Sequence, residues 1–140
     1  MSELILDLDV GNSATKWRLS ETKIGRFNNQ QFEQLGNLID IRPDRIRVAC
    51  VVDDIFKERL EKILRLNFNQ VPEFAQSTSF CAGLQNGYEK SDALGVDRWL
   101  AGLAAWIQND EKPCLIVDAG TALTIDTIDN EGIFRGGYIV

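Results

Sequence analysis

The order of hydrophobic and polar positions predicts alternating strands and helices along the chain. Residues 4–10 alternate between apolar and polar positions and end at Gly11-Asn12, which is typical of a strand followed by a tight turn. Residues 29–38 are polar with spaced apolar positions and predict a short helix. Further β-branched or alternating runs predict strands at 14–20, 23–28, 46–52, 114–117, 122–128 and 133–140.

Two longer segments have the apolar spacing of amphipathic helices. The first follows Asp53 or Asp54, either of which can cap it. Its expected apolar face consists of Phe56, Leu60, Ile63 and Leu64. The second covers about 96–108, and we expect its buried stripe to consist of Leu100, Leu103, Ala104 and Ile107. Between the two helices, residues 76–93 lack clear periodicity, and a loop of this length usually carries function.

Strands that alternate with helices predict an α/β protein. The chain also contains an internal repeat. Asp9-Val-Gly11 ends the first predicted strand, and Asp118-Ala-Gly120 ends a later one. In both places a small polar residue follows, and then a β-rich run that continues into a hairpin. The chain therefore begins the same strand and hairpin unit twice.

Length and composition narrow the class of protein. A chain of 140 residues with 44% apolar and 26% charged residues is typical of one soluble globular domain. The net charge of -6 argues against binding to nucleic acid or to an anionic membrane surface. The sequence contains neither a basic, apolar leader nor an apolar run long enough to span a membrane, so we expect a cytoplasmic protein.

The absence of histidine excludes several kinds of site. Ser-His-Asp triads, Cys-His dyads and histidine-ligated zinc are all impossible, so proton transfer must fall to a carboxylate, lysine, tyrosine or cysteine. The cysteines Cys50, Cys81 and Cys114 are odd in number and far apart, which argues against a disulfide framework or a zinc site. Cys50 and Cys114 lie in apolar runs, and we expect both to be buried thiols.

The two Asp-x-Gly turns have the chemistry of a phosphate site. Glycine lets the backbone approach phosphate closely, turn amides and hydroxyls donate to its oxygens, and a strand-end aspartate can hold Mg²⁺. One such turn is usually only structural, since Asp and Gly favour turns anyway. Two copies with matching surroundings favour a nucleotide-binding function.

Four ordered motifs resemble a known group of enzymes. With their paired turns they resemble the superfamily of acetate and sugar kinases, heat-shock chaperone ATPases and actin, and within it the type III pantothenate kinases, also called Bvg accessory factor-like. The Gly-x-Asp-Arg and Asp-Ala-Gly-Thr combination is the most discriminating. The motifs are Asp9-x-Gly-Asn-Ser-x-x-Lys16, Gly95-Val96-Asp97-Arg98, Asp118-Ala-Gly-Thr121-Ala-x-Thr124-x-Asp126 and Gly136-Gly137-Tyr-Ile.

The resemblance implies an ATP-dependent phosphorylation of pantothenate, the first step of coenzyme A synthesis. It implies Mg²⁺, a monovalent cation such as K⁺ or NH₄⁺, and a homodimer. The implied general base is Asp97, the implied ligand of the monovalent cation is Asp118, and Asp9 lies near Mg²⁺. The implied ATP and phosphate contacts are Asp9, Val10, Gly11, Asn12, Ser13, Ala14, Thr15, Lys16 and Thr121. The implied substrate contacts are Tyr88, Gly95, Val96, Asp97 and Arg98.

The residues by themselves leave alternatives open. At a helix start, Asp97 can serve as a cap or as a carboxylate favoured by the helix dipole. Arg98 can bind the carboxylate of pantothenate or form a surface ion pair. Lys16 can meet phosphate or only solvent, and Tyr88 can be a packed aromatic. We expect the three tryptophans to lie in the core or in an interface; these are Trp17, Trp99 and Trp106.

The chain departs from the family pattern in two respects. Ser91 stands where members often have proline, which loosens the substrate loop without removing a functional group. Members are also longer, so we expect a truncated chain that is inactive alone and self-associates through its C-terminal hairpin or the 94–108 region. The resemblance predicts a ribonuclease H-like, actin-type lobe with a mixed sheet flanked by helices at 1–113, and the opening strands of a similar lobe at 114–140. The alternatives are another small-molecule kinase of the superfamily and a nucleotide-dependent regulatory protein without kinase activity.

Overall fold

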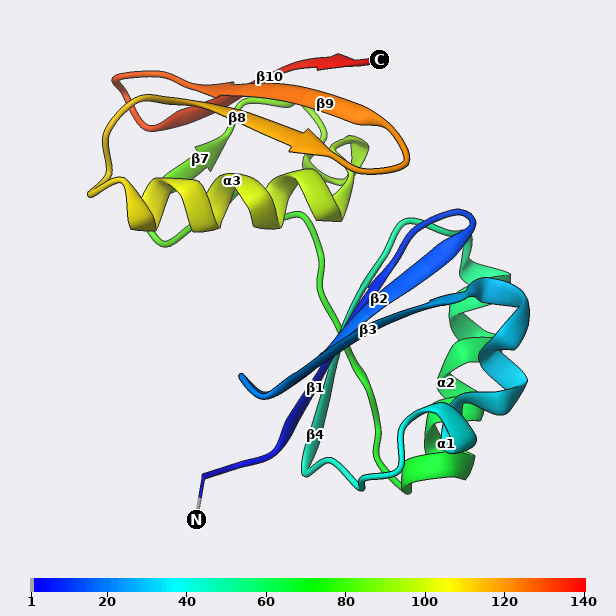
Figure 1. Ribbon diagram of the computed structural model, residues 1–140. Helices are drawn as coiled ribbons and strands as arrows, with labels where there is room; N and C mark the ends of the chain where they lie inside the picture. The colour runs from blue at the N-terminus through cyan, green and yellow to red at the C-terminus, as the bar shows by residue number, and fades with distance from the viewer. Residues whose placement is uncertain (1) are drawn as a thin grey trace. The chain divides into compact units, whose positions relative to one another are not determined.

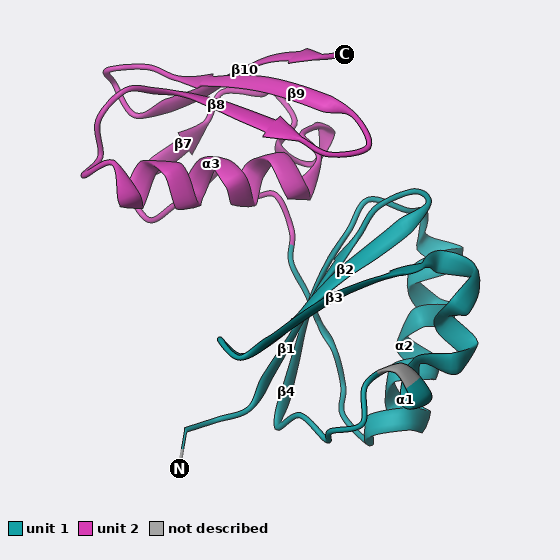
Figure 2. Cartoon of the chain, in the orientation of Figure 1, with its two compact units in different colours: residues 1–75 teal, residues 76–140 magenta. Residues whose placement is uncertain are grey.

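The computed structural model describes residues 2–140, apart from the side chain of Leu38, and divides into two compact units (Figure 2). The first unit is Met1–Ala75 and the second is Gln76–Val140. The predicted boundary between residues 113 and 114 stays a prediction.

The first unit is a mixed sheet with helices on one face (Figure 1). Its strand order is β3-β2-β1-β4-β5, in which β1 pairs antiparallel with β2 and parallel with β4. This confirms the α/β prediction and agrees with the expected ribonuclease H-like arrangement. The elements are β1 (Ile5–Val10), β2 (Ala14–Leu19), β3 (Lys23–Asn28), the 3₁₀ helix η1 (Asn29–Gln34), α1 (Leu35–Leu38), β4 (Arg45–Cys50), α2 (Asp54–Phe68) and β5 (Glu73–Phe74).

The alternation along β1 and the cap of α2 explain which residues form the core of this unit and where the helix begins. Leu6, Leu8 and Val10 of β1 point to the helix side and are at most 2% exposed, as the period of two requires. The helix α2 begins where Asp53 accepts a hydrogen bond from the amide of Phe56, as predicted. Its buried face consists of Leu60, Ile63, Leu64 and Phe68, while Phe56 is partly buried against the same core.

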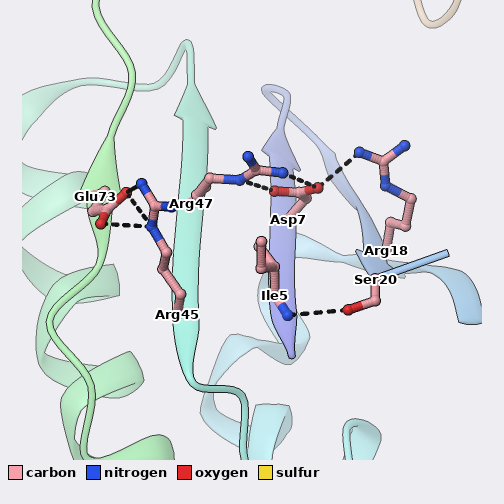
Figure 3. A network of polar contacts seen from close by, with 7 residues as sticks. All are labelled: Ile5, Asp7, Arg18, Ser20, Arg45, Arg47 and Glu73. Atoms are coloured by element: carbon pink, nitrogen blue, oxygen red, sulfur yellow. Dashed lines mark hydrogen bonds and ion pairs between the residues drawn. The ribbon is translucent and has the colours of Figure 1, made fainter. Parts of the chain in front are cut away.

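The opposite face of this sheet carries charges that no motif predicted (Figure 3). Asp7 of β1 lies between Arg47 of β4 and Arg18 of β2, with nitrogen to oxygen distances of 2.7 and 2.8 Å. Arg45 forms a further bidentate pair with Glu73. Burial by itself would raise the pKa of Asp7, but the hydrogen bonds from Arg47 and Arg18 outweigh it and hold the pKa below its ordinary value.

The second unit is a sheet with one helix packed against a face (Figure 1). Its strand order is β6-β7-β10-β9-β8, and its core surrounds Trp99, Trp106 and Phe134. Two of the three tryptophans are thus in this core, and Trp17 packs against the first one, as predicted. The elements are β6 (Phe80–Cys81), β7 (Leu84–Asn86), the 3₁₀ helix η2 (Ser91–Ala93), α3 (Val96–Gln108), β8 (Cys114–Ala119), β9 (Leu123–Ile128) and β10 (Ile133–Ile139).

The prediction of a structureless loop at 76–93 is wrong in part. The segment contains the β6–β7 hairpin and η2, and β7 pairs in parallel with β10 through Gln85 and Ile133. Strands of two or three residues are too short to leave a periodic pattern in the sequence. Their position comes from pairing with β10, which lies far along the chain.

The predicted buried stripe of α3 is wrong in part, because only Leu103 of its four residues packs, partly buried, against the core. Leu100 is 37% and Ile107 58% exposed, while the buried positions are Val96, Trp99, Gly102 and Trp106. Both sets have helical spacing, so periodicity could not choose between them. The tryptophans bury more area than the aliphatic side chains, and Gly102 allows close approach, because a Cβ there would lie 2.6 Å from the Phe134 ring.

The prediction of two buried thiols is correct for only one of them. Cys50, at the end of β4, is buried in the core of the first unit. Cys114 is half-buried at the start of β8, which is an edge strand of its sheet. An edge strand has a neighbour on one side only, so an apolar run there can remain partly open to water.

The internal repeat is confirmed in the order of turn and strands, although the hydrogen bond that closes the first turn spans three positions and that of the second turn spans two. After β1 the amide of Gly11 donates to the carbonyl of Ala14 at 3.0 Å, and after β8 the amide of Gly120 donates to the carbonyl of Ala122 at 3.0 Å. Each turn leads into an antiparallel meander, β1-β2-β3 in one unit and β8-β9-β10 in the other.

Candidate active site

The first Asp-x-Gly turn is braced by an asparagine from η1. The Asn29 side chain donates to the carbonyl of Gly11 at 2.6 Å and accepts from the hydroxyl of Thr15 at 2.8 Å. The Asn29 backbone amide also donates to the carbonyl of Ser13 at 3.0 Å. Thr15 is fully buried, so its hydroxyl depends on this partner. Asn29 therefore fixes the backbone of the predicted phosphate loop.

The charged residues next to this turn are exposed to solvent. Asp9 and Lys16 are register partners across β1 and β2, and both are exposed. Asn12 and Ser13 are exposed at the tip of the turn. This arrangement brings one carboxylate, one ammonium group and a tight turn together, which is the donor set that a phosphate group with a bound cation requires.

The second turn carries Asp118 and Thr121, which are both exposed. In the β8–β9 register, Asp118 is the partner of Thr124, and Ile116 is the partner of Asp126. Because alternate residues share a face, Asp118 and Asp126 lie on the same side of the sheet, on neighbouring strands.

The segment Gly95–Arg98 forms the start of α3. Gly95 is the N-cap, and its carbonyl accepts from the amide of Trp99 at 3.1 Å. Asp97 lies half-buried in the first turn, where its Oδ1 accepts from the amide of Arg98 at 2.8 Å. A Cβ at Gly95 would lie 2.8 Å from that oxygen. The absence of a side chain at Gly95 therefore makes room for the Asp97 carboxylate at the start of the helix.

Arg98 forms a nearly buried ion pair rather than a surface one. Its Nε donates to Oδ2 of Asp126 at 3.0 Å, and its Nη2 donates to Oδ1. The two side chains are only 12% and 3% exposed. The hydrogen bond to Asp126 raises the pKa of the Arg98 guanidinium above its ordinary value, and Tyr88 adds to this rise.

The loop that carries Tyr88 is held by a second asparagine. Asn86 is 6% exposed, and its Nδ2 donates to the carbonyls of Thr78 and Ser91, both at 3.2 Å. Its Oδ1 accepts from the amide of Tyr88 at 3.0 Å. Gly136 has a φ of +78°, and a Cβ there would lie 2.7 Å from the Tyr88 hydroxyl. The absence of a side chain at Gly136 therefore makes room for Tyr88, which is part of the core as well as of the predicted site.

Within each unit the structure brings predicted site residues together. In the second unit these are Tyr88, Asp97 and Arg98, with Asp118 on the sheet face that also carries Asp126. Sequence reasoning missed the supporting residues Asn29, Asn86 and Asp126. A signal was available for Asp126, which belongs to a motif quoted for the resemblance, whereas the two asparagines lie outside every motif.

A family model described as type III pantothenate kinase matches residues 5–140. The chain belongs to this family. A type III pantothenate kinase of Cellvibrio japonicus is 36% identical over 148 residues, which cover 97% of this chain and 57% of that relative. Another type III pantothenate kinase, of Hydrogenovibrio crunogenus, is 40% identical over 111 residues, which cover 79% of this chain and 44% of that relative.

The match therefore spans only about half the length of these type III pantothenate kinases, 57% of the first and 44% of the second. Among solved structures, it is similar to an inorganic polyphosphate/ATP-glucomannokinase of Arthrobacter, with a TM-score of 0.49 and 12% identity, over 98% of this chain and 62% of that one. Family membership is confirmed, and the roles of individual residues stay predictions.

Proposed function

We propose that this chain carries the substrate-binding and phosphate-binding segments of an enzyme that transfers the γ-phosphoryl group of ATP to pantothenate. The observation that carries the proposal is the family match over residues 5–140. The relatives named above have this activity in their names. The product is 4'-phosphopantothenate, and the reaction is the first step of coenzyme A synthesis.

In this mechanism Asp97 is the general base. The primary hydroxyl oxygen of pantothenate attacks the γ-phosphorus, the bond from that phosphorus to the β–γ bridging oxygen breaks, and ADP leaves. The hydroxyl proton goes to Asp97. A carboxylate is the natural base in a chain without histidine, and the Oδ1 contact with the amide of Arg98 keeps the carboxylate oriented.

Arg98 and Tyr88 bind pantothenate, with Gly95 and Val96 forming the backbone of the substrate loop. The guanidinium of Arg98 is suited to the carboxylate of pantothenate because it recognises a carboxylate through two parallel hydrogen bonds.

The turn from Asp9 to Lys16 and Thr121 bind the phosphates of ATP. Among residues 2–140, no group of three or more histidine, cysteine, aspartate or glutamate side chains could hold a metal ion. Mg²⁺ commonly uses one or two carboxylates together with substrate phosphates and water, so its binding does not require such a group. Asp9, exposed at the end of β1, is the candidate carboxylate, and Mg²⁺ would offset phosphate charge. The exposed carboxylate of Asp118 is an oxygen ligand suited to a monovalent cation.

The proposal includes a homodimer and a cytoplasmic location. Within residues 2–140, no helix has the length and apolar character needed to cross a membrane. Another superfamily kinase is the less favoured candidate, because the matched family model is that of pantothenate kinase.

A substrate panel tests this function. ADP release by the full-length gene product is measured with pantothenate, glucose or acetate, each with K⁺ and with Na⁺ in its place. We expect turnover with pantothenate alone, dependent on K⁺, and no turnover by residues 1–140 alone. Turnover with glucose or acetate would instead support another superfamily kinase, and ATP binding without turnover on any substrate would support a regulatory protein.

A further inference from the structure

The ion pair between Arg98 and Asp126 joins the first turn of α3 to the middle of β9. Its two side chains are 12% and 3% exposed, so both charges are largely removed from water. A charge in such a place is tolerated only with a well-placed partner. In this chain the partner of Arg98 is therefore built into the sheet beneath the helix.

The pair uses only one edge of the guanidinium. Asp126 accepts from Nε and from Nη2, which is a side-on contact. The second N–H of Nη2 and the facing N–H of Nη1 form the end-on edge, and this fork matches the spacing of another carboxylate. Arg98 can thus be held by Asp126 through one edge and still donate hydrogen bonds to the carboxylate of a ligand through the other.

The surroundings hold the guanidinium in this orientation. Tyr88 contributes to the electrostatic environment of Arg98 from a different segment of the chain. The Tyr88 ring lies against Gly136, with its hydroxyl 2.7 Å from the position that a Cβ of Gly136 would take. Asp126, with Tyr88 beside it, therefore restricts the side chain that the proposed function assigns to the substrate.

We propose that Asp126 is a positioning residue, which holds the guanidinium of Arg98 so that its end-on fork meets the carboxylate of pantothenate. This inference rests on the proposed function. A purely structural ion pair is the competing explanation, since buried pairs also occur where no ligand binds. The two explanations differ in one respect. A positioning role affects recognition of the substrate carboxylate, whereas a structural role lowers activity toward all substrates alike.

The test uses pantothenate and pantothenol, which is the same molecule with the carboxylate replaced by a hydroxymethyl group. For the full-length gene product and its Asp126→Asn variant, kcat and KM are measured with each compound. We expect wild type to prefer pantothenate in kcat/KM by at least about tenfold, the scale of hydrogen bonds to a charged group. We expect Asp126→Asn to lose most of this preference through a raised KM for pantothenate, with KM for ATP and kcat at saturation within about threefold.

The matched control is Asp129→Asn on the same hairpin, which removes the charge of a half-buried aspartate that pairs with Arg135 at 2.6 Å, while the asparagine oxygen can still accept from the amides of Glu131 and Ile133. Its preference for pantothenate should equal that of wild type. If Asp126→Asn fails to fold, as judged by circular dichroism, Asp126→Glu replaces it, because it keeps the charge but shifts the guanidinium by the length of a methylene.

An unchanged preference in a folded Asp126 variant overturns the inference and leaves the proposed function intact. Wild type that does not phosphorylate pantothenate overturns the proposed function, and this inference with it. Arg98→Lys should reproduce the raised KM for pantothenate, and combining it with Asp126→Asn should add little, because both changes remove the same fork.

Discussion

The brace between Asn29 and Thr15 leads to a prediction about the first phosphate turn. Asn29 is tied to Gly11 and Thr15 by side-chain hydrogen bonds of 2.6 and 2.8 Å. Thr15 has no exposed surface, so water cannot replace a lost partner of its hydroxyl. Asn29→Ala should therefore cost more than the value of the two hydrogen bonds that it deletes.

The magnitude follows from these contacts. A deleted hydrogen bond costs about 0.5–1.5 kcal/mol, and a buried group left without a partner costs about 1–3 kcal/mol. We expect Asn29→Ala to lower the free energy of unfolding by about 2–3 kcal/mol, and Thr15→Val by about 1 kcal/mol, because Asn29 is half-buried and can turn to water. In the double variant no hydroxyl is left unpaired, so the combined loss should fall short of the sum by about 1–2 kcal/mol.

A double-mutant cycle measured by urea unfolding and circular dichroism checks this. Hydrogen exchange of residues 8–16 should rise in Asn29→Ala, and the control Gln30→Ala, an exposed neighbour, should match wild type in both measurements. Losses that add to within about 0.3–0.5 kcal/mol would show that the two side chains are independent, and would refute the brace.

Two further predictions concern charge and thiols. Because the folded-state pKa of Asp7 is lowered, its carboxylate stabilises the fold above about pH 4 and loses this contribution as the pH falls through the folded value. Urea unfolding of Asp7→Asn should show destabilisation at pH 7 that shrinks below pH 4, whereas the exposed control Asp40→Asn should show little change at either pH; a loss independent of pH would contradict the ion pairing. With a thiol reagent under native conditions, the exposed Cys81 should react first and Cys50 last, since burial raises the pKa of the Cys50 thiol, and a faster reaction at Cys50 would disprove its burial.

The sequence predicted the elements well where the signal was local. The strands of both meanders, the start of α2 and the limits of α3 follow from alternation, helical spacing and turn residues. The hairpin at 80–86 escaped prediction because its position depends on pairing with β10, which lies about fifty residues later. The buried face of α3 escaped it because the helix is apolar on more than one side, and only contact with Phe134 selects the tryptophan face.

The same distinction holds for the site. Motifs gave the turn residues and the Asp97-Arg98 pair, since their types and spacing are visible in a single stretch of chain. They did not give the partners that hold these residues. Asn29 and Asp126 contact residues that lie 14 and 28 positions away along the chain, and Asn86 holds the loop to which it belongs. Such contacts appear only after folding. Residue type alone would not have found Asn29 and Asn86, because each is an ordinary polar residue outside every motif, whereas Asp126 lies in a quoted motif that did not reveal its partner.

The general-base role of Asp97 is the central claim, and one comparison tests it most directly. In the full-length gene product, kcat with saturating pantothenate and the Kd for ATP are measured for wild type, Asp97→Asn and the control Asp92→Asn, an exposed aspartate of η2. The account predicts that Asp97→Asn lowers kcat by at least about 10²-fold, the usual scale for a general base, with the Kd for ATP little changed and the control like wild type. Turnover of Asp97→Asn close to that of wild type would contradict it.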